Sequence, residues 1–253
     1  MLRTRIIPTL LLRNESLVKT VQFDKFTYVG DPCNTLRIFN ELEVDELIIL
    51  DITASRNNYP PNLNVLKDIA DECFMPLGYG GGIQTIEQAK EILQIGFEKI
   101  VINSYALENP SLISQLAEYF GSQAIIVSID VKKDFWGTSR IWTHAGKRKH
   151  KLDPIEWAKQ LEQLGAGEIL LTSIEREGTW DGFDIALIKA ITESVDIPVI
   201  CNGGAGSLND IGLAVNEGGA SAVGLGSMVV FQKKGMGVLI NFPQKELIEK
   251  VLD

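Results

Sequence analysis

Two aspartates stand where short apolar runs end, and they are the sequence's best candidates for acid and base chemistry. Asp51 follows the run ELIIL, and Asp130 follows AIIVSI. In a barrel of parallel strands, side chains at the carboxyl ends of the strands meet at one face, so both carboxylates should point into a shared site. An aspartate in this place can also be a plain helix cap. We favour a functional role for both.

Two glycine-rich turns have the composition of phosphate-binding loops. GGGI at 80–83 and GGAG at 203–206 each follow a strand-like run, and glycine lets backbone N–H groups approach an anion closely. The pairs Asn103-Ser104 and Gly226-Ser227 come after the next strand-like runs, and both landmarks repeat after 123 residues, from 80 to 203 and from 104 to 227. One such cluster is ordinary turn chemistry. Two matched clusters predict a small molecule with a phosphate at each end.

The chain alternates short apolar runs with amphipathic stretches, which is typical of repeated βα units. The repeat of the glycine motifs further predicts that the barrel consists of two duplicated half-barrels. An open Rossmann sheet is disfavoured because no GxGxxG turn follows the first strand. We therefore predict an α/β fold, a single (βα)8 TIM barrel that forms one domain over residues 1–253. The predicted strands are 6–12, 47–52, 75–79, 100–103, 124–130, 169–172, 199–202 and 222–226, and predicted helices include 33–42, 86–94, 111–119, 154–164 and 208–216.

The composition disfavours two kinds of partner, nucleic acids and membranes. A net charge of −9 disfavours nucleic acid, and no apolar run reaches the roughly 18 residues that a membrane helix needs. We expect a cytoplasmic protein without a membrane segment. The three cysteines form no ligand cluster, so we predict no metal and no cofactor. The basic stretch 147–151 is interpreted as a solvated loop, and His144 and His150 as surface residues.

Several stretches resemble the HisF family, the cyclase subunit of imidazole glycerol phosphate synthase. They are RII at 5–7, GDP at 30–32, DELIILDITAS at 45–55, ENPSLI at 108–113, FGSQAIIVSID at 120–130 and GAGEILLTSI at 165–174, together with both glycine motifs. The resemblance runs from Arg3 to about Ser227. It implies a ligand with two phosphate ends at the barrel mouth. It also implies a heterodimer with a HisH-like glutaminase, which docks at the opposite face and delivers ammonia through the barrel.

The resemblance also assigns roles to residues. One phosphate end would contact Gly82, Asn103 and Ser104, and the other Gly178, Gly204, Gly226 and Ser227, with Lys19 on the first loop over the mouth and Asp51 as a further substrate contact. A solvated loop cation is the alternative for Lys19. The ammonia gate would consist of Arg5, Glu46, Lys99 and Glu168, each at the start of a strand, and Glu98 would dock the partner. A charge before a single strand is usually just solvated, but four at the family's gate positions favour the gate.

One departure from the family concerns catalysis. HisF proteins use an aspartate pair as general acid and base, at the ends of strands one and five. Here Asp130 is present, but Leu11 replaces its partner. A leucine cannot transfer a proton, and losing one positioned acid or base costs about 10²- to 10⁴-fold in rate. Glu15, four residues later, is a candidate substitute.

The tail FQKKGMGVLINFP at 231–243 also differs from the usual HisF ending and resembles a paralogous branch found with surface polysaccharide genes. In that branch a HisH and HisF pair supplies ammonia to a third protein, an amidotransferase that makes an acetamidino sugar. Our first hypothesis is such an ammonia-supplying subunit with weakened cyclase chemistry. The alternative is an authentic cyclase of histidine biosynthesis, which converts the phosphoribulosyl aminoimidazole carboxamide ribonucleotide plus ammonia to imidazole glycerol phosphate and AICAR. A sister barrel isomerase, which needs no ammonia, is a third reading.

Overall fold

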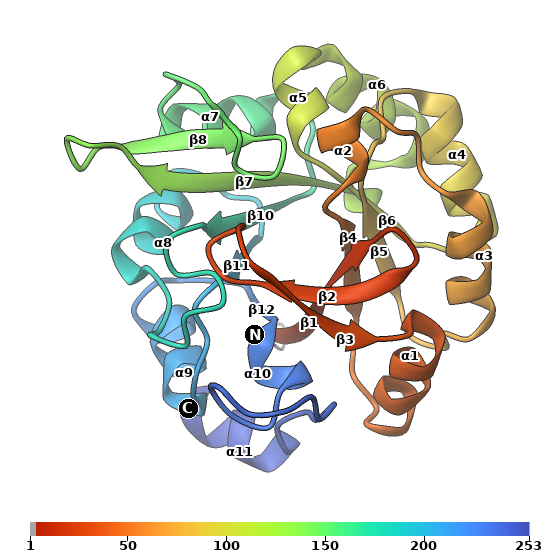
Figure 1. Ribbon diagram of the computed structural model, residues 1–253. Coiled ribbons are helices and arrows are strands. Elements are labelled where there is room, and N and C mark those ends of the chain that lie inside the picture. Colours follow the sequence, from red (N-terminus) through yellow and green to blue (C-terminus); the bar gives the residue numbers. More distant parts are fainter. Residues whose placement is uncertain (1–3, 253) are drawn as a thin grey trace.

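Eight parallel strands close into a barrel in the computed structural model (Figure 1), which describes residues 4–252. Residues 1–3 and 253 of the predicted domain lie outside this range. Each strand pairs with the next in parallel, and the last pairs with the first. The predicted (βα)8 barrel is confirmed. The barrel strands are β1 (Arg5–Arg13), β4 (Leu47–Asp51), β5 (Leu77–Gly80), β6 (Lys99–Ile102), β7 (Ile125–Lys133), β10 (Glu168–Ser173), β11 (Val199–Asn202) and β12 (Ala222–Leu225).

Helices cover the outside of the barrel, and their ends follow from local sequence. In α4 and α9, a Thr or Ser side chain caps the first turn and a side chain three residues later bonds back to the cap residue. No helix within residues 4–252 is long and apolar enough to cross a membrane. The helices are α1 (Pro32–Glu41), α2 (Ala54–Asn57), α3 (Leu63–Asp71), α4 (Ile86–Ile95), α5 (Ser104–Glu108), α6 (Ser111–Phe120), η1 (Ser122–Ala124), α7 (Pro154–Gln163), α8 (Ile185–Thr192), α9 (Leu208–Asn216), α10 (Ser227–Val230) and α11 (Lys245–Leu252).

The barrel interior is built in layers because every second strand residue points inward. An apolar cluster fills its middle, and its buried members come from seven of the barrel strands: Ile7, Ile48, Val101, Ile126, Leu170, Ile200 and Ala222. Two residues before four members of this cluster, at or just before the starts of their strands, stand Arg5, Glu46, Lys99 and Glu168. The layer on the mouth side contains mainly polar side chains, among them Thr9, Ser128, Thr172 and Asn202. From the base of the barrel to its mouth, the three interior layers are therefore charged, apolar and mainly polar.

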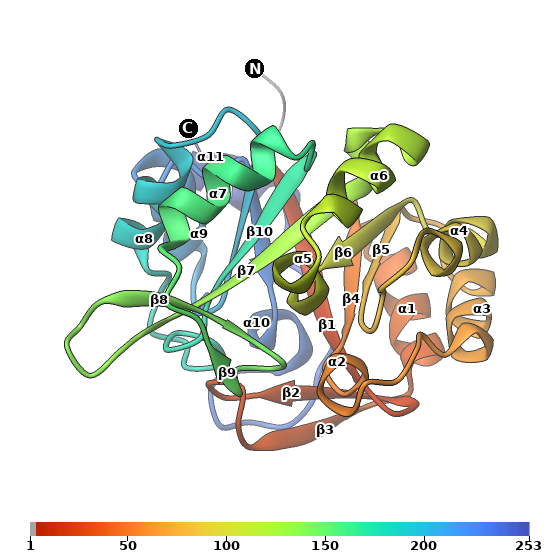
Figure 2. The same ribbon diagram turned by 90° about the horizontal axis from the view of Figure 1, so that it is seen from above.

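Two strand hairpins extend the barrel where the sequence had indicated only loops. After β1, the strands β2 (Ser16–Thr20) and β3 (Phe26–Gly30) turn back across the mouth. After β7, the strands β8 (Ser139–Thr143) and β9 (Arg148–Lys149) continue the sheet. Figure 2 shows β2, β3 and β9 gathered at one end of the barrel, with α11 at the other end. Both hairpins thus shape the mouth.

Candidate functional site

A cavity opens at the carboxyl ends of the barrel strands, and every residue that the sequence predicted for the mouth lines it. The phosphate-binding candidates and the proton-transfer positions contribute to one continuous wall. The predicted residues in this wall are Leu11, Lys19, Asp51, Gly82, Asn103, Ser104, Asp130, Gly178, Gly204, Gly226 and Ser227. The cavity also contains residues that the sequence did not indicate, among them Thr9, Ser128, His144, Thr172, Glu177 and Asn202.

Asp130 is the carboxylate best placed for proton transfer. It lies on β7 and is 8% exposed. Its Oδ2 accepts a hydrogen bond from Asn103 Nδ2 at 2.9 Å, and its Oδ1 accepts one from Ser128 Oγ at 3.2 Å. Burial raises the pKa of Asp130 to about 7, although the bonds from Ser128, Asn103 and Thr172 oppose the shift. A carboxyl group with this pKa can both accept and return a proton near neutral pH.

Lys19 lies on strand β2 and not on a loop, which corrects the prediction. It is 6% exposed, so the alternative of a solvated cation is wrong. Its Nζ donates to the carbonyl of Thr9 at 3.0 Å and lies against Gly226, where a Cβ would collide with it. Burial lowers the pKa of Lys19 to about 8, while the nearby charge of Glu177 acts in the opposite direction.

Glu177 is a buried acid in the cavity wall that sequence reasoning missed. It is 6% exposed, and it anchors the β2–β3 hairpin by accepting bonds from Thr20 Oγ1 at 2.9 Å and from the Phe23 backbone N–H at 3.2 Å. Burial raises the pKa of Glu177, opposed first by Lys19. The neighbouring Gly178 has φ +74°, and a Cβ there would collide with the Thr20 carbonyl, so the hairpin packs directly on this loop. The only sequence signal was its place beside Gly178.

The two glycine-rich turns face each other across the mouth. They follow β5 and β11, which are separated by three strands in either direction around the closed barrel. The short helices α5 and α10 begin at Ser104 and Ser227. Their N-cap residues have nearly the same dihedral angles, with φ −122° and ψ −87° at Asn103 and φ −99° and ψ −98° at Gly226. No side chain caps either first turn. The two halves thus repeat in geometry as well as in sequence.

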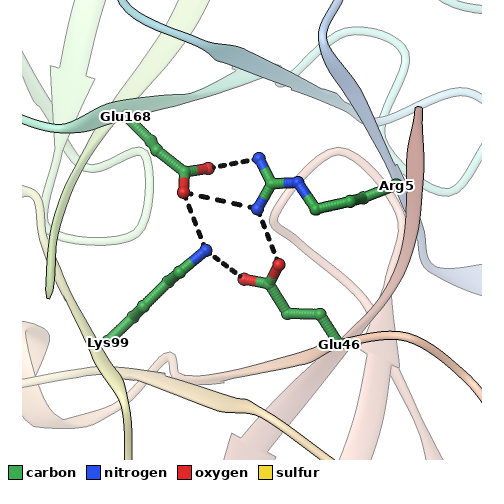
Figure 3. Close-up of polar contacts among 4 residues, drawn as sticks. All are labelled: Arg5, Glu46, Lys99 and Glu168. Carbon is green, nitrogen blue, oxygen red and sulfur yellow. Dashed lines mark hydrogen bonds and ion pairs between the residues drawn. The ribbon is translucent and has the colours of Figure 1, made fainter. Parts of the chain in front are cut away.

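Four charged side chains close a ring at the opposite end of the barrel (Figure 3). Arg5 donates to Glu46 Oε2 at 2.6 Å and to Glu168 Oε2 at 2.7 Å. Lys99 donates to Glu46 Oε1 at 2.8 Å and to Glu168 Oε1 at 2.7 Å. Each cation thus bonds both carboxylates, which compensates the cost of placing charges on the barrel axis. The structure brings the four predicted gate residues together.

Comparison with known proteins places this architecture in a family. A family model described as "Histidine biosynthesis protein" matches residues 5–234. The chain is 51% identical over 243 residues to "Putative imidazole glycerol phosphate synthase subunit hisF2" of Pseudomonas aeruginosa, covering 96% of this chain and 97% of the relative. It is 45% identical over 254 residues to the similarly named hisF3 of Vibrio vulnificus, covering 100% and 98%. The chain belongs to the HisF family.

Within this HisF chain, the Leu11 side chain occupies the strand-one position of the cavity wall. It is 7% exposed and lies between Val18 of β2 and Leu50 of β4 in the sheet. The candidate substitute Glu15 is exposed in the turn after β1 and does not line the cavity. In this arrangement Glu15 is therefore not a second acid.

Asp51 has a structural role beside its place in the HisF mouth. Its Oδ1 accepts bonds from the Thr53 backbone N–H at 2.8 Å, the Thr53 hydroxyl at 2.7 Å and the Ala54 N–H at 3.0 Å. One carboxylate oxygen thus holds the start of α2. The alternative of a helix cap accounts for that oxygen, and the side chain still lines the cavity.

The remaining predicted residues lie at the two ends of the barrel of this HisF protein. Glu98 is exposed immediately before the gate strand β6. His150 is partly buried and contacts Thr143. His144 is also partly buried, and it lines the cavity, which the sequence did not indicate. The hairpin that carries it was not recognisable from the sequence.

Proposed function

We propose that this chain is a HisF-like synthase subunit that receives ammonia from a HisH-like glutaminase and delivers it to a biosynthetic amidation. The glutaminase docks at the gate end, beside Glu98. The ammonia acceptor is an amidotransferase that makes an acetamidino sugar for a surface polysaccharide. The two phosphate ends of the mouth bind a phosphorylated small molecule, and the chain's own cyclase activity is weak.

The layered interior supports passage of ammonia. Beyond the ring of Arg5, Glu46, Lys99 and Glu168 lies the apolar layer that includes Ile7 and Leu170. An apolar passage admits neutral ammonia and disfavours ammonium, because a charge loses its hydration there. The ring is closed in this structure, so at least one ion pair must open for each molecule that passes. Docking of the glutaminase supplies the free energy for this opening.

The two ends of the mouth support binding of a bisphosphate. Gly82, Asn103 and Ser104 form one end, and Gly204, Gly226 and Ser227 form the other, with the Lys19 ammonium beside Gly226. Backbone N–H groups at the starts of α5 and α10 would donate to the phosphates. Gly178 is the weakest of the predicted contacts, since its conformation is explained by packing of the β2–β3 hairpin.

A single observation carries the proposal of weak cyclase chemistry: Leu11 forms the cavity wall where the family has its second carboxylate. Asp130 is then the only acid of the predicted pair. Glu177 lies in the same cavity, but both of its oxygens accept bonds from the β2–β3 hairpin. In this arrangement Glu177 therefore anchors the hairpin and does not serve as a second acid.

The test is cyclase turnover with ammonium salts as the nitrogen source, which bypasses the glutaminase. We expect a rate about 10²- to 10⁴-fold below that of a HisF protein with both aspartates, measured in parallel. The complex with its glutaminase should still release ammonia that an added acceptor consumes. Turnover at the rate of the reference protein would overturn the proposal.

The buried acid at position 177 favours a second candidate, an authentic cyclase of histidine biosynthesis. If a bound substrate displaces the hairpin bonds, Glu177 becomes free to work opposite Asp130. This candidate predicts that the chain restores growth of a histidine auxotroph lacking its own cyclase subunit, and that Glu177→Gln abolishes this growth. The first candidate predicts no restoration by either protein.

A further inference from the structure

Residues 132–151 form a strongly basic segment in an otherwise acidic chain. They include seven Lys or Arg residues and one acid, Asp134, so their net charge is +6. Since the whole chain has a net charge of −9, the remaining residues together carry −15. The segment covers the end of β7 and all of β8 and β9, so the stretch that the sequence indicated as a solvated loop is part of this sheet extension. The net charge of the chain therefore does not describe what this surface attracts.

Two aromatic side chains stand at the tip of the β7–β8 hairpin. Phe135 is 93% exposed and Trp136 is 86% exposed, and their rings pack edge to face with 5.5 Å between the centroids. Figures 1 and 2 both show the tip extending beyond the helices that surround the barrel. Neither residue lines the cavity. A large apolar pair that is exposed in this way indicates an interaction surface separate from the candidate active site.

The turn that presents the two rings is held by the carboxylate of Asp134. Its Oδ1 accepts bonds from the backbone N–H groups of Trp136 at 3.0 Å and Thr138 at 3.1 Å. Its Oδ2 lies 3.4 Å from Arg140 Nε and 3.5 Å from Lys149 Nζ. The one acid of the basic segment is thus used within the turn. Because the tip is already ordered, little conformational entropy is lost when it binds a partner.

The strand register places three of the cations on one face of this sheet extension. Lys132 pairs with Arg140 across β7 and β8, and Trp142 pairs with Lys149 across β8 and β9. Paired residues share a face of a sheet, and Arg140 and Trp142 are two residues apart on one strand, so all four side chains lie on the same face. Lys132 Nζ lies 5.6 Å from the centroid of the Trp142 ring. The opposite face is buried at Ile141, which leaves the cationic face open to solvent.

We propose that the β7–β9 extension binds an anionic lipid surface, with Phe135 and Trp136 entering the headgroup region and the cations of residues 132–151 facing the headgroups. Clustered Lys and Arg residues are attracted to anionic lipids, and aromatic rings are favoured at the boundary between headgroups and acyl chains. The acidic remainder of the chain is compatible with this contact. Charges farther from the lipid than about 10 Å are largely screened at physiological ionic strength, and the hairpin tip projects from the barrel.

The composition of the extension favours lipid over a protein or a nucleic acid. Two exposed rings provide little of the roughly 800 Å² that each partner buries in a stable protein interface. Protein interfaces are also depleted in Lys, whereas five of the seven cations here are Lys. The two rings are inclined by 86° to each other, so they form no row of parallel faces on which successive bases could stack. A lipid surface needs neither a matched shape nor a fixed spacing of charges.

The test is sedimentation of the full chain with vesicles of phosphatidylcholine alone or of phosphatidylcholine and phosphatidylglycerol in equal parts. We expect binding to the anionic vesicles only. Lys147→Gln combined with Lys151→Gln, at two exposed positions, should lower the affinity about tenfold or more, because each lysine near an anionic membrane contributes about fivefold. Lys67→Gln combined with Lys90→Gln makes the same change in net charge at exposed positions of α3 and α4 and should change the affinity little.

The aromatic tip is tested in the same vesicles. Phe135→Ser combined with Trp136→Ser should lower the affinity about tenfold, since burial of apolar surface in the headgroup region is lost. Phe74→Ser, at a position before β5 that is 88% exposed, is the control and should have no effect. Tryptophan fluorescence of the wild type should shift to shorter wavelength on binding. Trp136→Phe should remove this shift and retain binding.

Three results would overturn the inference. The first is the absence of binding to the anionic vesicles at physiological ionic strength. The second is an equal loss of binding in the hairpin variants and in their matched controls, which would indicate general adsorption. The third is a chain that ignores the vesicles but binds a single-stranded oligonucleotide or a second copy of itself through the hairpin, since the occupant would then be a nucleic acid or a protein.

Discussion

The two ends of the barrel hold buried charge in different ways. At the base, Arg5 and Lys99 each bond both Glu46 and Glu168, and the four charges sum to zero within one closed ring. At the mouth, Lys19, Asp130 and Glu177 are buried more completely than Arg5 and Lys99, but the structure gives Lys19 no direct ion pair within residues 4–252. Burial shifts the pKa of all three toward the neutral form.

This difference is the one we expect between a charge cluster that is compensated within the fold and the proposed ligand site at the mouth. A closed ring gains nothing from a further charge, whereas an undercompensated lysine can be stabilised by a bound phosphate. The same difference leads us to expect that Leu11, which stands where the family has an aspartate, affects the proposed chemistry and leaves the barrel intact. Substitutions at the mouth should therefore change activity and pH response, and substitutions at the base should change stability.

Leu11→Asp is expected to have the largest effect. It restores a carboxylate at the strand-one position of the cavity, opposite Asp130. Ammonium-dependent cyclase turnover should rise by about 10²-fold or more, because a second positioned acid or base contributes about 10² to 10⁴. The rate of imidazole glycerol phosphate formation measures this.

Leu11→Asn is the matched control, since it has nearly the same shape and polarity as aspartate but transfers no proton. Only Leu11→Asp should raise the turnover rate. Equal turnover rates for the two variants would show that the shape and polarity of the side chain at position 11, and not its ability to transfer a proton, determine the rate.

Asp130→Asn should change how stability depends on pH. Because the folded-state pKa of about 7 lies above the unfolded value of 3.8, the folded chain retains a proton that the unfolded chain loses. Asp130 therefore contributes stability below about pH 4 that is lost as the pH rises to about 7. The difference of about 3 between the folded and unfolded pKa values of Asp130 corresponds to at most about 4 kcal/mol in the free energy of unfolding. Relative to wild type, the variant should gain stability between pH 5 and pH 8 in urea unfolding.

Asp24→Asn, at an exposed position between β2 and β3, is the control for this experiment. It should leave the pH dependence of unfolding unchanged. A parallel pH response of wild type and Asp130→Asn would mean that burial does not raise the pKa of Asp130.

The sequence predicted the barrel and most of its mouth because these depend on periodic patterns. Apolar runs defined the strands, and the glycine repeats located both halves of the site. The hairpins after β1 and β7 were missed, since their strands are short and several of their residues, such as Phe26 and Tyr28, are exposed. Glu177 and His144 were missed with them. Their roles depend on which side chains a hairpin brings to the cavity, and sequence spacing does not encode that.

At the base, Glu168→Gln should destabilise the fold by about 3 kcal/mol, because it leaves two part-buried cations sharing the one remaining carboxylate of Glu46. The free energy of unfolding in urea measures this. Glu72→Gln, which breaks the exposed ion pair with Arg37, is the control and should change stability little. Similar effects of the two substitutions would contradict the view that the ring is a compensated structural unit.

Thr20→Val tests the smallest effect, the anchoring of the β2–β3 hairpin over the mouth. The substitution removes the hydroxyl that donates to Glu177 at 2.9 Å and leaves a buried carboxylate oxygen without that donor. Opening of the hairpin should become easier by about 1 kcal/mol, which corresponds to about fivefold faster hydrogen exchange of its amides. Thr27→Val, at an exposed position of β3, should not change these rates. If exchange in Thr20→Val is unchanged, Glu177 is not acting as an anchor, and it would be free to serve as the second acid beside Asp130.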